Sequence, residues 1–347
     1  MPQVIRFVDR FQVDVAEYDA PPLLPATCRV STLYSGISAG TELTAYRGTN
    51  PYLTSVWDPD LRLFSQGEGA APAYPLEGWG YSEVGEVVEI ADDVTSIEVG
   101  QRVWGIWGHR SEVVLPAAPL AAKSMSPDVD PVLGSFVRVG AIALNAVLAA
   151  RVSLGETVVV MGQGVIGLLA TSFAVRSGAD VVVVDPIASR RDRGLAMGAA
   201  SAVAPGESVA RAIRERTRGR GADAVIELSG SHEALHEALR IAGPDARVTA
   251  AGFYQGGAGA LRLGEEFHHN RVQLVASQIG SLPPHLHHRW DRGRLEATTL
   301  DMVSAGRPDV ARLVSHRFAV HEADQAYELL DRSPADALQV LIDFTKE

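Results

Sequence analysis

The chain has 347 residues, of which 46% are hydrophobic and 21% are charged. At roughly 150 residues per domain, this length indicates about two domains, and the apolar content excludes intrinsic disorder for most of the chain. The formal net charge of −11 argues against a nucleic-acid partner, because phosphate recognition needs clustered positive charge.

A single cysteine, Cys28, can form neither an internal disulfide nor a multi-cysteine zinc site. The first residues lack the basic and apolar regions of a secretory signal peptide. No uncharged apolar run reaches the roughly 18 residues of a membrane span. These features predict a cytoplasmic protein with no membrane partner.

Short apolar or alternating runs, separated by glycine and proline, characterise the first third of the chain. Such runs are typical of strands in a β-barrel or sandwich-like module. They lie at residues 30–34, 84–90, 102–106 and 112–115. Residues 51–75 have weak periodicity and predict a long surface loop.

The pattern changes near residue 130. Residues 131–151 are apolar and rich in alanine, which predicts a helix. Beyond them, continuous apolar strands alternate with helices, as in a parallel sheet covered on both faces. The predicted strands are 157–161, 181–184, 202–204, 224–228, 247–251 and 272–279, and the predicted helices between them include 165–177, 189–197 and 232–241. Six such strands fit an α/β, doubly wound dinucleotide-binding fold.

The most specific local signal is a glycine-rich turn that directly follows a buried strand and directly precedes a helix. Its first glycine permits a tight turn, its second lets the backbone approach a pyrophosphate, and its third lets helix and strand pack closely. The helix N-terminus would present free N–H groups to the phosphates. The turn consists of Gly162, Gln163, Gly164, Val165, Ile166 and Gly167.

Asp185 follows the second strand at about the spacing of ~20 residues expected for a ribose-binding acid. Its carboxylate would repel a 2′-phosphate, which favours NAD over NADP, although Arg190 and its neighbouring arginines leave NADP open. Alternatively, the glycines only make a tight turn and Asp185 caps a helix. Later strand ends should also face the cofactor. The residues at those ends are Ser229, Gly252, Phe253 and Ser277.

The chain resembles the medium-chain alcohol and polyol dehydrogenases, the zinc-type dehydrogenase superfamily. The motifs that carry the resemblance are residues 36–42 (GISAGTE), 80–88 (GYSEVGEVV), 99–103 (VGQRV), the glycine-rich turn, 197–199 (MGA) and 316–318 (HRF). The resemblance implies a GroES-like, β-rich substrate domain at 1–150 and a Rossmann domain at 151–281. It also implies a return to the first domain at 282–347, where we expect helices at 295–305 and 322–330 and a strand at 338–344. Residues 36–42 and 107–112 (WGHRSE) look most like the branch that includes bacteriochlorophyllide dehydrogenases.

The zinc ligands of this family are replaced at the matching positions. Either Ser38 or Ala39 stands in place of the cysteine, Tyr81 in place of the histidine and Ser82 in place of the glutamate. The remaining ligand position falls at Val137 or Arg138, and neither side chain binds zinc. The resemblance therefore implies a member without zinc, and we predict no metal site.

Without a Lewis acid, hydrogen-bond donors and a general base must act on the alcohol oxygen. Tyr81 occupies a ligand position and Thr41 matches the family's proton-relay hydroxyl, whereas Ser38, His109 and Arg138 are further candidates. Four of these five residues also have a structural interpretation: a packed aromatic ring for Tyr81, a turn cap for Thr41, a loop histidine for His109 and a surface cation for Arg138. His268, His269, His285, His287 and His288 are interpreted as solvated loop histidines.

These features predict a zinc-independent, NAD-dependent oxidoreductase that interconverts a secondary alcohol and a ketone. The alcohol would be a polyol, a cyclitol or a biosynthetic intermediate. Two alternatives are an NADPH-dependent enoyl or quinone reductase and a non-catalytic NAD-binding protein. We also expect a homodimer, because the last Rossmann strand would be an exposed apolar edge unless it is paired.

Overall fold

The computed structural model describes residues 1–65, 73–206 and 208–346. It divides into two compact units, one formed by Met1–Arg138 and Asp309–Glu347 and the other by Val139–Pro308. The predicted domain boundaries at 150 and 282 both fall inside the second unit. The reason is that residues 139–150 contact its other elements: a Cβ on Gly140 would touch Thr299, and Asn145 donates a hydrogen bond to Ser277.

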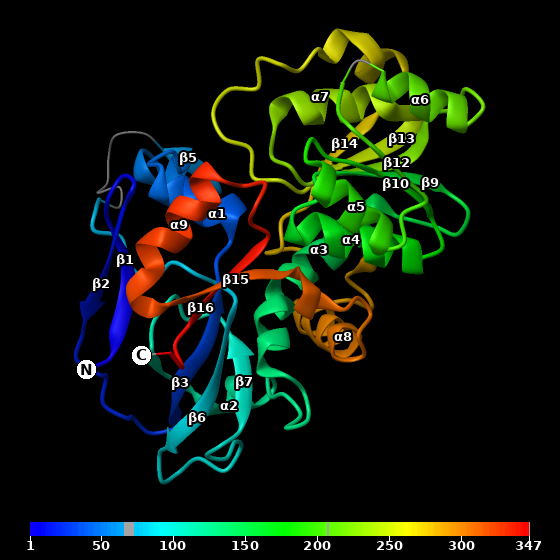
Figure 1. Cartoon of the computed structure of the whole chain (residues 1–347). Helices are drawn as coiled ribbons and strands as arrows, with labels where there is room; N and C mark the ends of the chain where they lie inside the picture. The colour runs from blue at the N-terminus through cyan, green and yellow to red at the C-terminus, as the bar shows by residue number, and fades with distance from the viewer. Residues whose placement is uncertain (66–72, 207, 347) are drawn as a thin grey trace. The chain divides into compact units, whose positions relative to one another are not determined.

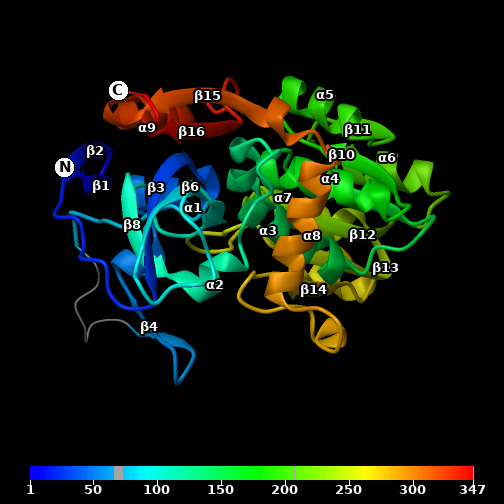
Figure 2. The same cartoon turned by 90° about the horizontal axis from the view of Figure 1, so that it is seen from below.

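The first unit is built mainly of strands, as Figures 1 and 2 show. Its elements before the second unit are β1 (Gln3–Asp9), β2 (Gln12–Glu17), β3 (Thr27–Gly36), α1 (Ala39–Tyr46), η1 (Pro51–Leu53), β4 (Val56–Asp58), β5 (Leu63–Ser65), β6 (Glu83–Ile90), β7 (Arg102–Gly105), β8 (Glu112–Pro116), α2 (Ala117–Ala121) and η2 (Pro131–Phe136). After the second unit come η5 (Val310–Leu313), β15 (Val314–Ala319), η6 (Val320–Glu322), α9 (Ala323–Arg332) and β16 (Gln339–Asp343).

The C-terminal strands complete the main sheet of the first unit. Its order is β15-β16-β3-β6-β7, and β8 pairs with β3. Helix α9 packs on the same core: the rings of Phe7 and Tyr327 lie 5.0 Å apart, and Tyr327 also stacks on Tyr46 at 5.7 Å. This core therefore fixes α9 against α1 and β1, which come from the opposite end of the sequence.

The second unit is a parallel sheet with its connecting helices. Its elements are α3 (Val137–Ala150), β9 (Thr157–Met161), α4 (Val165–Arg176), β10 (Asp180–Val184), α5 (Ala188–Ala196), β11 (Ser201–Val203), α6 (Val209–Arg216), β12 (Ala222–Glu227), α7 (His232–Ile241), β13 (Ala242–Ala250), η3 (Leu263–Phe267), β14 (Gln273–Ala276), η4 (Pro284–Leu286) and α8 (Arg292–Ser304). The unit boundary falls just after the first residues of α3.

The strand order β11-β10-β9-β12-β13-β14 confirms the predicted doubly wound sheet. All residues of β9 are buried, as the continuous apolar run predicts for a strand that is covered on both faces. The chain leaves β9 toward β10 on one side and returns to β12 on the other. This change of direction places the carboxyl end of β9 at the topological switch point, where ligands bind in such folds.

Two sequence expectations differ from the structure in detail. The last strand of the sheet covers only Gln273–Ala276 instead of 272–279. Within 51–65 the expected loop contains η1, β4 and β5, and the rings of Trp57 and Phe64 lie 5.0 Å apart. Residues 66–72 of that expected loop lie outside the described residues.

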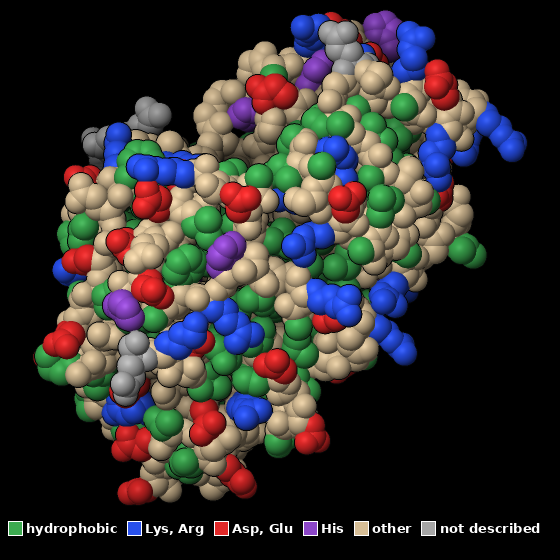
Figure 3. All heavy atoms as spheres, viewed as in Figure 1, with side chains coloured by type: hydrophobic (Ala, Val, Ile, Leu, Met, Phe, Trp, Pro, Cys, Tyr) green, Lys and Arg blue, Asp and Glu red, His purple; other side chains and the backbone are tan. Residues whose placement is uncertain are grey.

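Among the described residues, one helical stretch, Pro131–Ala150, is long and apolar enough to cross a membrane by length and composition, and 78% of its most apolar 18-residue window is buried inside the structure. A buried core helix of a globular protein meets the same criterion. On the face shown in Figure 3, acidic and basic side chains are interspersed over the surface.

Candidate active site

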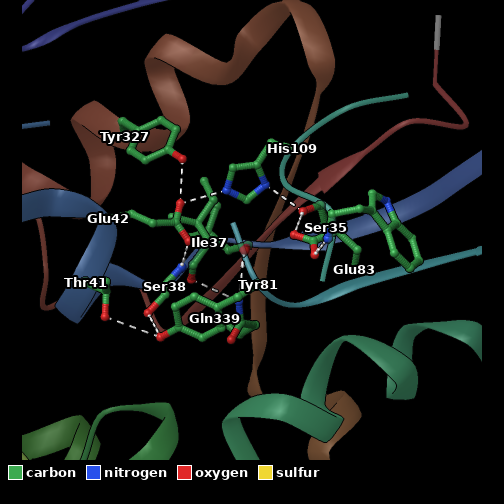
Figure 4. A network of polar contacts seen from close by, with 12 residues as sticks. Ser35, Ile37, Ser38, Thr41, Glu42, Tyr81, Glu83, His109, Tyr327 and Gln339 are labelled. Atoms are coloured by element: carbon green, nitrogen blue, oxygen red, sulfur yellow. Dashed lines mark hydrogen bonds and ion pairs between the residues drawn. The ribbon is translucent and has the colours of Figure 1, made fainter. Parts of the chain in front are cut away.

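Three hydroxyl groups that the sequence singled out lie together in the first unit (Figure 4). Ser38 follows β3 as the N-cap residue of α1, Thr41 lies in the first turn of α1, and Tyr81 precedes β6. The Tyr81 hydroxyl is hydrogen-bonded to Ser38 Oγ and lies 3.4 Å from Thr41 Oγ1. We call Ser38, Thr41 and Tyr81 the hydroxyl cluster.

Local structure explains how these groups converge. The end of β3 is held by Gly36 N donating to Ser82 O and by Ile37 N donating to Val340 O. Ser38 directly follows these two residues. The first bond therefore holds Ser38 near the segment that carries Tyr81, and the second holds it near β16. Ser38 Oγ makes no helix-capping hydrogen bond and is directed to Tyr81 instead.

A second layer of polar residues lies behind the hydroxyl cluster and is fully buried. Glu42 Oε1 accepts a hydrogen bond from Ser38 N at 2.8 Å, and Glu42 Oε2 lies 2.7 Å from His109 Nε2. The hydroxyl of Tyr327 donates to Glu42 Oε2 at 2.6 Å. On the other side of the ring, His109 Nδ1 lies 2.5 Å from Ser35 Oγ, which donates to Glu83 Oε1 at 3.0 Å.

Burial and neighbouring charges shift the pKa values of this site. Burial raises the pKa of Tyr81; hydrogen bonds from Ser38 and Thr41 oppose that rise, the charge of Glu42 adds to it, and the positive charge of Arg138 lowers it. Burial alone would lower the pKa of His109, but the carboxylate of Glu42, helped by that of Glu83, raises it overall. Burial also raises the pKa of Glu83.

The structure separates the predicted catalytic residues into two groups. Ser38, Thr41 and Tyr81 share one cluster, and Arg138, half-buried at the start of α3, is close enough to act on Tyr81 electrostatically. His109 is 1% exposed and both its ring nitrogens have protein partners. The prediction that His109 acts directly on a substrate therefore does not fit the structure.

Four residues of the buried layer were not identified from the sequence: Ser35, Glu42, Glu83 and Tyr327. Glu42 directly follows Thr41 in the GISAGTE motif, so its position was the available signal. Tyr327 lies 285 positions from Glu42 in the chain, and no local pattern could indicate that contact.

The donor set at the family's metal position does not fit zinc. Zinc in proteins is held by thiolate, imidazole or carboxylate ligands, whereas Ser38, Tyr81 and Ser82 offer hydroxyl groups. The described residues contain no group of three His, Cys, Asp or Glu side chains that could hold a metal ion. His109 and the nearby carboxylates are engaged with one another and with Ser35 instead of being available as metal ligands.

In the second unit, the predicted cofactor residues follow strand ends that lie in one row. Val184 of β10 pairs with Met161 of β9, and Met161 pairs with Glu227 of β12. Glu227 in turn pairs with Ala250 of β13, which pairs with Ala276 of β14. The residues that follow these ends are Asp185, Gly162, Ser229, Gly252, Phe253 and Ser277. The sheet therefore brings these six predicted residues to one edge.

The glycine-rich turn fits the phosphates of a dinucleotide. Gly164 is the N-cap of α4, and no side chain caps the free N–H groups of this helix. Val165 and Ile166 form its first turn. A Cβ on Gly164 would meet no atom within 4 Å, whereas a Cβ on Gly167 would lie 1.8 Å from Gly162 O. The turn thus leaves its backbone open at Gly164 and closes tightly on itself at Gly167.

Gln163 and Asp185 support this turn from the inside. The Gln163 side chain is fully buried, donates to Val160 O and accepts a hydrogen bond from Thr171. Its expected contact with the cofactor therefore cannot come from the side chain. Asp185 is 3% exposed and accepts hydrogen bonds from Gln163 N at 2.7 Å and Ile187 N at 2.8 Å. Arg190 lies near enough for Asp185 to counteract the lowering of the Arg190 pKa by burial.

The buried carboxylate of Glu227, which no sequence motif indicated, organises the next strand ends. Glu227 accepts hydrogen bonds from Ser229 N at 2.8 Å and Gly230 N at 3.3 Å, and also from the hydroxyls of Ser229 and Tyr254. Ser229 and Phe253 are exposed beside it. Glu227 thus joins the loop after β12 to the loop after β13.

Comparisons with known proteins agree with this architecture. Residues 165–293 match the family described as zinc-binding dehydrogenase. The chain is 29% identical over 338 residues to D-guloside 3-dehydrogenase of Escherichia coli (strain K12), an alignment that covers 95% of this chain and 96% of the relative. It is 26% identical over 311 residues to L-threonine 3-dehydrogenase of Pyrococcus horikoshii, covering 80% of this chain and 85% of the relative.

Solved structures show the same fold. The 2R,3R-butanediol dehydrogenase from Bacillus subtilis superposes with a TM-score of 0.79 at 19% identity and covers 99% of both chains. A zinc-binding dehydrogenase from Sinorhizobium meliloti 1021, bound to NADP, gives a TM-score of 0.79 at 22% identity and also covers 99% of both chains. The GroES-like and Rossmann architecture predicted from the sequence is thereby confirmed. By its motifs, its fold and these matches, the chain is similar to the oxidoreductases of the medium-chain dehydrogenase/reductase superfamily, and alcohol and polyol dehydrogenases are among the proteins it resembles.

Proposed function

We propose that this protein interconverts a secondary alcohol of a polyol, cyclitol or sugar derivative and the corresponding ketone without zinc, using NAD(H), with Tyr81 as the proton donor and acceptor. The observation that carries the proposal is the hydroxyl cluster, in which Tyr81 matches a zinc-ligand position of the family and Thr41 matches the family's proton-relay hydroxyl. The likeness to D-guloside 3-dehydrogenase supports a sugar-like substrate.

The chemistry requires one hydride and one proton to move. When bound, the nicotinamide supplies the hydride donor or acceptor. In the reducing direction, Tyr81 donates its phenolic proton to the substrate carbonyl oxygen. Ser38 and Thr41 hold the phenol oxygen in place and stabilise its charge by hydrogen bonding, and Arg138 favours the phenolate electrostatically. In oxidation the phenolate takes the alcohol proton back.

The role of Tyr81 is tested by Tyr81→Phe. This change keeps the ring and removes the transferable proton, so kcat should fall about 10²- to 10⁴-fold. Tyr18→Phe is the matched control, because Tyr18 bonds to Glu112 O on another part of the same unit. Both variants are assayed with a panel of polyols and sugar derivatives by the absorbance of the reduced cofactor. Full activity of Tyr81→Phe would refute the assignment.

The direction of the Tyr81 pKa shift sets the expected pH dependence. Because burial raises that pKa above its ordinary value of 10.0, the phenol is protonated at neutral pH. Ketone reduction should therefore proceed at neutral pH and decline only as the pH rises through the raised pKa, and alcohol oxidation should accelerate over that range. A reduction rate that declines already near neutral pH would point to a different acid.

Zinc independence and coenzyme choice are tested separately. Dialysis against a chelator should leave activity unchanged, and elemental analysis of the active protein should find no stoichiometric zinc. Titration with both coenzymes should show a preference for NAD(H), because the carboxylate of Asp185, at the spacing expected for the ribose-binding acid, would repel a 2′-phosphate. Loss of activity that zinc restores would contradict zinc independence. A preference for NADPH would contradict the assignment of NAD(H) as the coenzyme. NADPH-dependent reduction of activated alkenes would favour the enoyl or quinone reductase alternative, and coenzyme binding without turnover would favour the non-catalytic one.

A further inference from the structure

The buried layer behind the hydroxyl cluster allows its hydrogen atoms to be assigned. Ser35 has one hydroxyl proton and donates it to Glu83 Oε1 at 3.0 Å. It must therefore accept from His109 Nδ1 at 2.5 Å, so that this nitrogen carries a proton.

The other ring nitrogen faces a carboxylate whose remaining partners are donors. Glu42 accepts from Ser38 N at 2.8 Å and from the Tyr327 hydroxyl at 2.6 Å, and His109 Nε2 lies 2.7 Å from Glu42 Oε2. Because both of these partners donate to Glu42, its carboxyl group acts as an acceptor here, and the proton of the remaining contact is assigned to Nε2. With this assignment of hydrogens, His109 is an imidazolium paired with the Glu42 carboxylate.

This ion pair is completely removed from water. Glu42 is 0% exposed and His109 is 1% exposed. Burying an ion pair costs desolvation free energy that the mutual attraction does not reliably offset, so gain in stability is a weak reason for such a pair. A fixed charge with a fixed direction can instead serve a neighbouring site.

The neighbouring site is the proton donor proposed above. Glu42 holds the backbone of Ser38, and the side chain of Ser38 holds the hydroxyl of Tyr81 (Figure 4). At an ordinary helix start, the hydroxyl of the N-cap residue accepts an N–H of the first turn. Here Glu42 satisfies the backbone N–H of Ser38, and the Ser38 hydroxyl makes no capping bond and meets Tyr81 instead.

We infer that Glu42 and His109 are positioning residues: their buried ion pair holds Ser38, and through Ser38 it holds the Tyr81 hydroxyl in the geometry needed for proton transfer. This inference rests on the proposed function of Tyr81. The charged groups that act on Tyr81 are Glu42 from α1 and Arg138 from the start of α3. Glu42 raises the pKa of Tyr81 and Arg138 lowers it, so the two charges have opposite effects on the pKa of the proton donor.

Glu42→Gln removes the charge and keeps a side chain of the same length. The titration of Tyr81 is followed by tyrosinate absorbance, as the difference between proteins with and without Tyr81→Phe. In Glu42→Gln this titration should move to lower pH, because the negative charge that raises the pKa of Tyr81 is gone. Nitrogen-labelled histidine NMR should show His109 with both ring protons at neutral pH in the wild type and with one in the variant. The kcat should fall on the order of 10²-fold, with little change in the KM for the coenzyme.

Two further variants separate charge from position. Glu42→Asp keeps the charge but withdraws it from Ser38 N, so kcat should fall while the Tyr81 titration stays near that of the wild type. Tyr327→Phe removes one donor from Glu42 and should cause a smaller loss of kcat. If Glu42→Gln does not fold, these two variants carry the test. Glu89→Gln, a change in an exposed ion pair with Arg29, is the control that should alter nothing.

The outcomes distinguish this inference from the function on which it rests. Full activity of Tyr81→Phe refutes the function, whereas the spectroscopic titrations of Tyr81 and His109 need no turnover. An unchanged Tyr81 titration in Glu42→Gln, or a wild-type His109 with a single ring proton at neutral pH, would overturn the inference even if Tyr81 is essential.

Discussion

Gly164 and Gly167 belong to the same turn but are glycines for different physical reasons. Alanine at 167 would drive its Cβ to 1.8 Å from Gly162 O, whereas alanine at 164 would touch no protein atom within 4 Å. We therefore expect Gly167→Ala to destabilise the protein by about 1–3 kcal/mol and to lower the thermal unfolding midpoint. Gly164→Ala should leave that midpoint unchanged.

Cofactor binding separates the two positions further. The backbone at Gly164 is where a pyrophosphate must approach, so the Gly164→Ala methyl group should weaken NADH binding by about tenfold or more, that is by at least about 1.4 kcal/mol. Quenching of protein fluorescence by NADH measures this affinity. Unchanged affinity in a stably folded Gly164→Ala protein would remove the glycine-rich turn from the cofactor site.

Single residues also show how far sequence reasoning reaches. Ser38, Thr41 and Tyr81 could be found because each lies in a short motif with a recognisable chemical role. The burial of His109 could not be read from the sequence, since its partners Glu42 and Ser35 come from another part of the chain. The burial of the Gln163 side chain had no signal for a similar reason, because a motif for backbone approach at a turn does not indicate where the side chain points.

At the scale of elements, the buried carboxylate of Glu227 at the end of β12 gives a signed pH effect. Burial raises the pKa of Glu227 above its ordinary 4.5, despite the hydrogen bonds from Ser229 and Tyr254. The neutral Glu227 carboxyl group contributes to the free energy of unfolding in full below pH 4.5, its ordinary pKa. That contribution is lost as the pH rises through the raised pKa of Glu227 in the folded protein. Glu227→Gln is always neutral, so its thermal midpoint should improve relative to that of the wild type as pH increases above 4.5.

Glu233 provides the control with the opposite sign. It lies in the first turn of α7, and a hydrogen bond from Ser231 lowers its pKa. The ionised Glu233 side chain therefore stabilises the protein above its ordinary pKa, and this stabilisation is lost as the pH falls. The thermal unfolding midpoint of Glu233→Gln should accordingly decline slightly relative to that of the wild type as the pH rises. If both variants showed the same trend by scanning calorimetry, the opposed shifts would be contradicted.

Elements with strong periodicity were predictable, and those that depend on distant partners were not. The continuous valine runs of β9 and β10 indicated strands that are covered on both faces, and the sheet confirms this. By contrast, β4 and β5 are short strands whose rings contact each other across the pair, and neither they nor β15 were expected as strands. The strand β16 was expected at 338–344, but its place in a sheet with strands near the N-terminus followed from the family resemblance alone. Such pairings depend on tertiary contacts that carry no local period.

At the scale of the whole molecule, the free edge of the parallel sheet predicts self-association. β14 is the terminal strand of that sheet, and Leu274 in it is 39% exposed. An unpaired edge that carries apolar side chains favours pairing with another strand, and a second copy of the chain offers the same edge in a closed two-fold arrangement. We therefore expect light scattering to give the mass of a dimer.

A lysine in this strand tests the proposal, because charge on an edge opposes pairing. Leu274→Lys should give the mass of a single chain and leave the thermal unfolding of the monomer cooperative. Leu154→Lys is the matched control, since Leu154 is 86% exposed and precedes β9 instead of lying on the sheet edge. That variant should remain a dimer. A wild-type protein that is monomeric at micromolar concentration, or a Leu274→Lys protein that stays dimeric, would show that β14 does not form the interface.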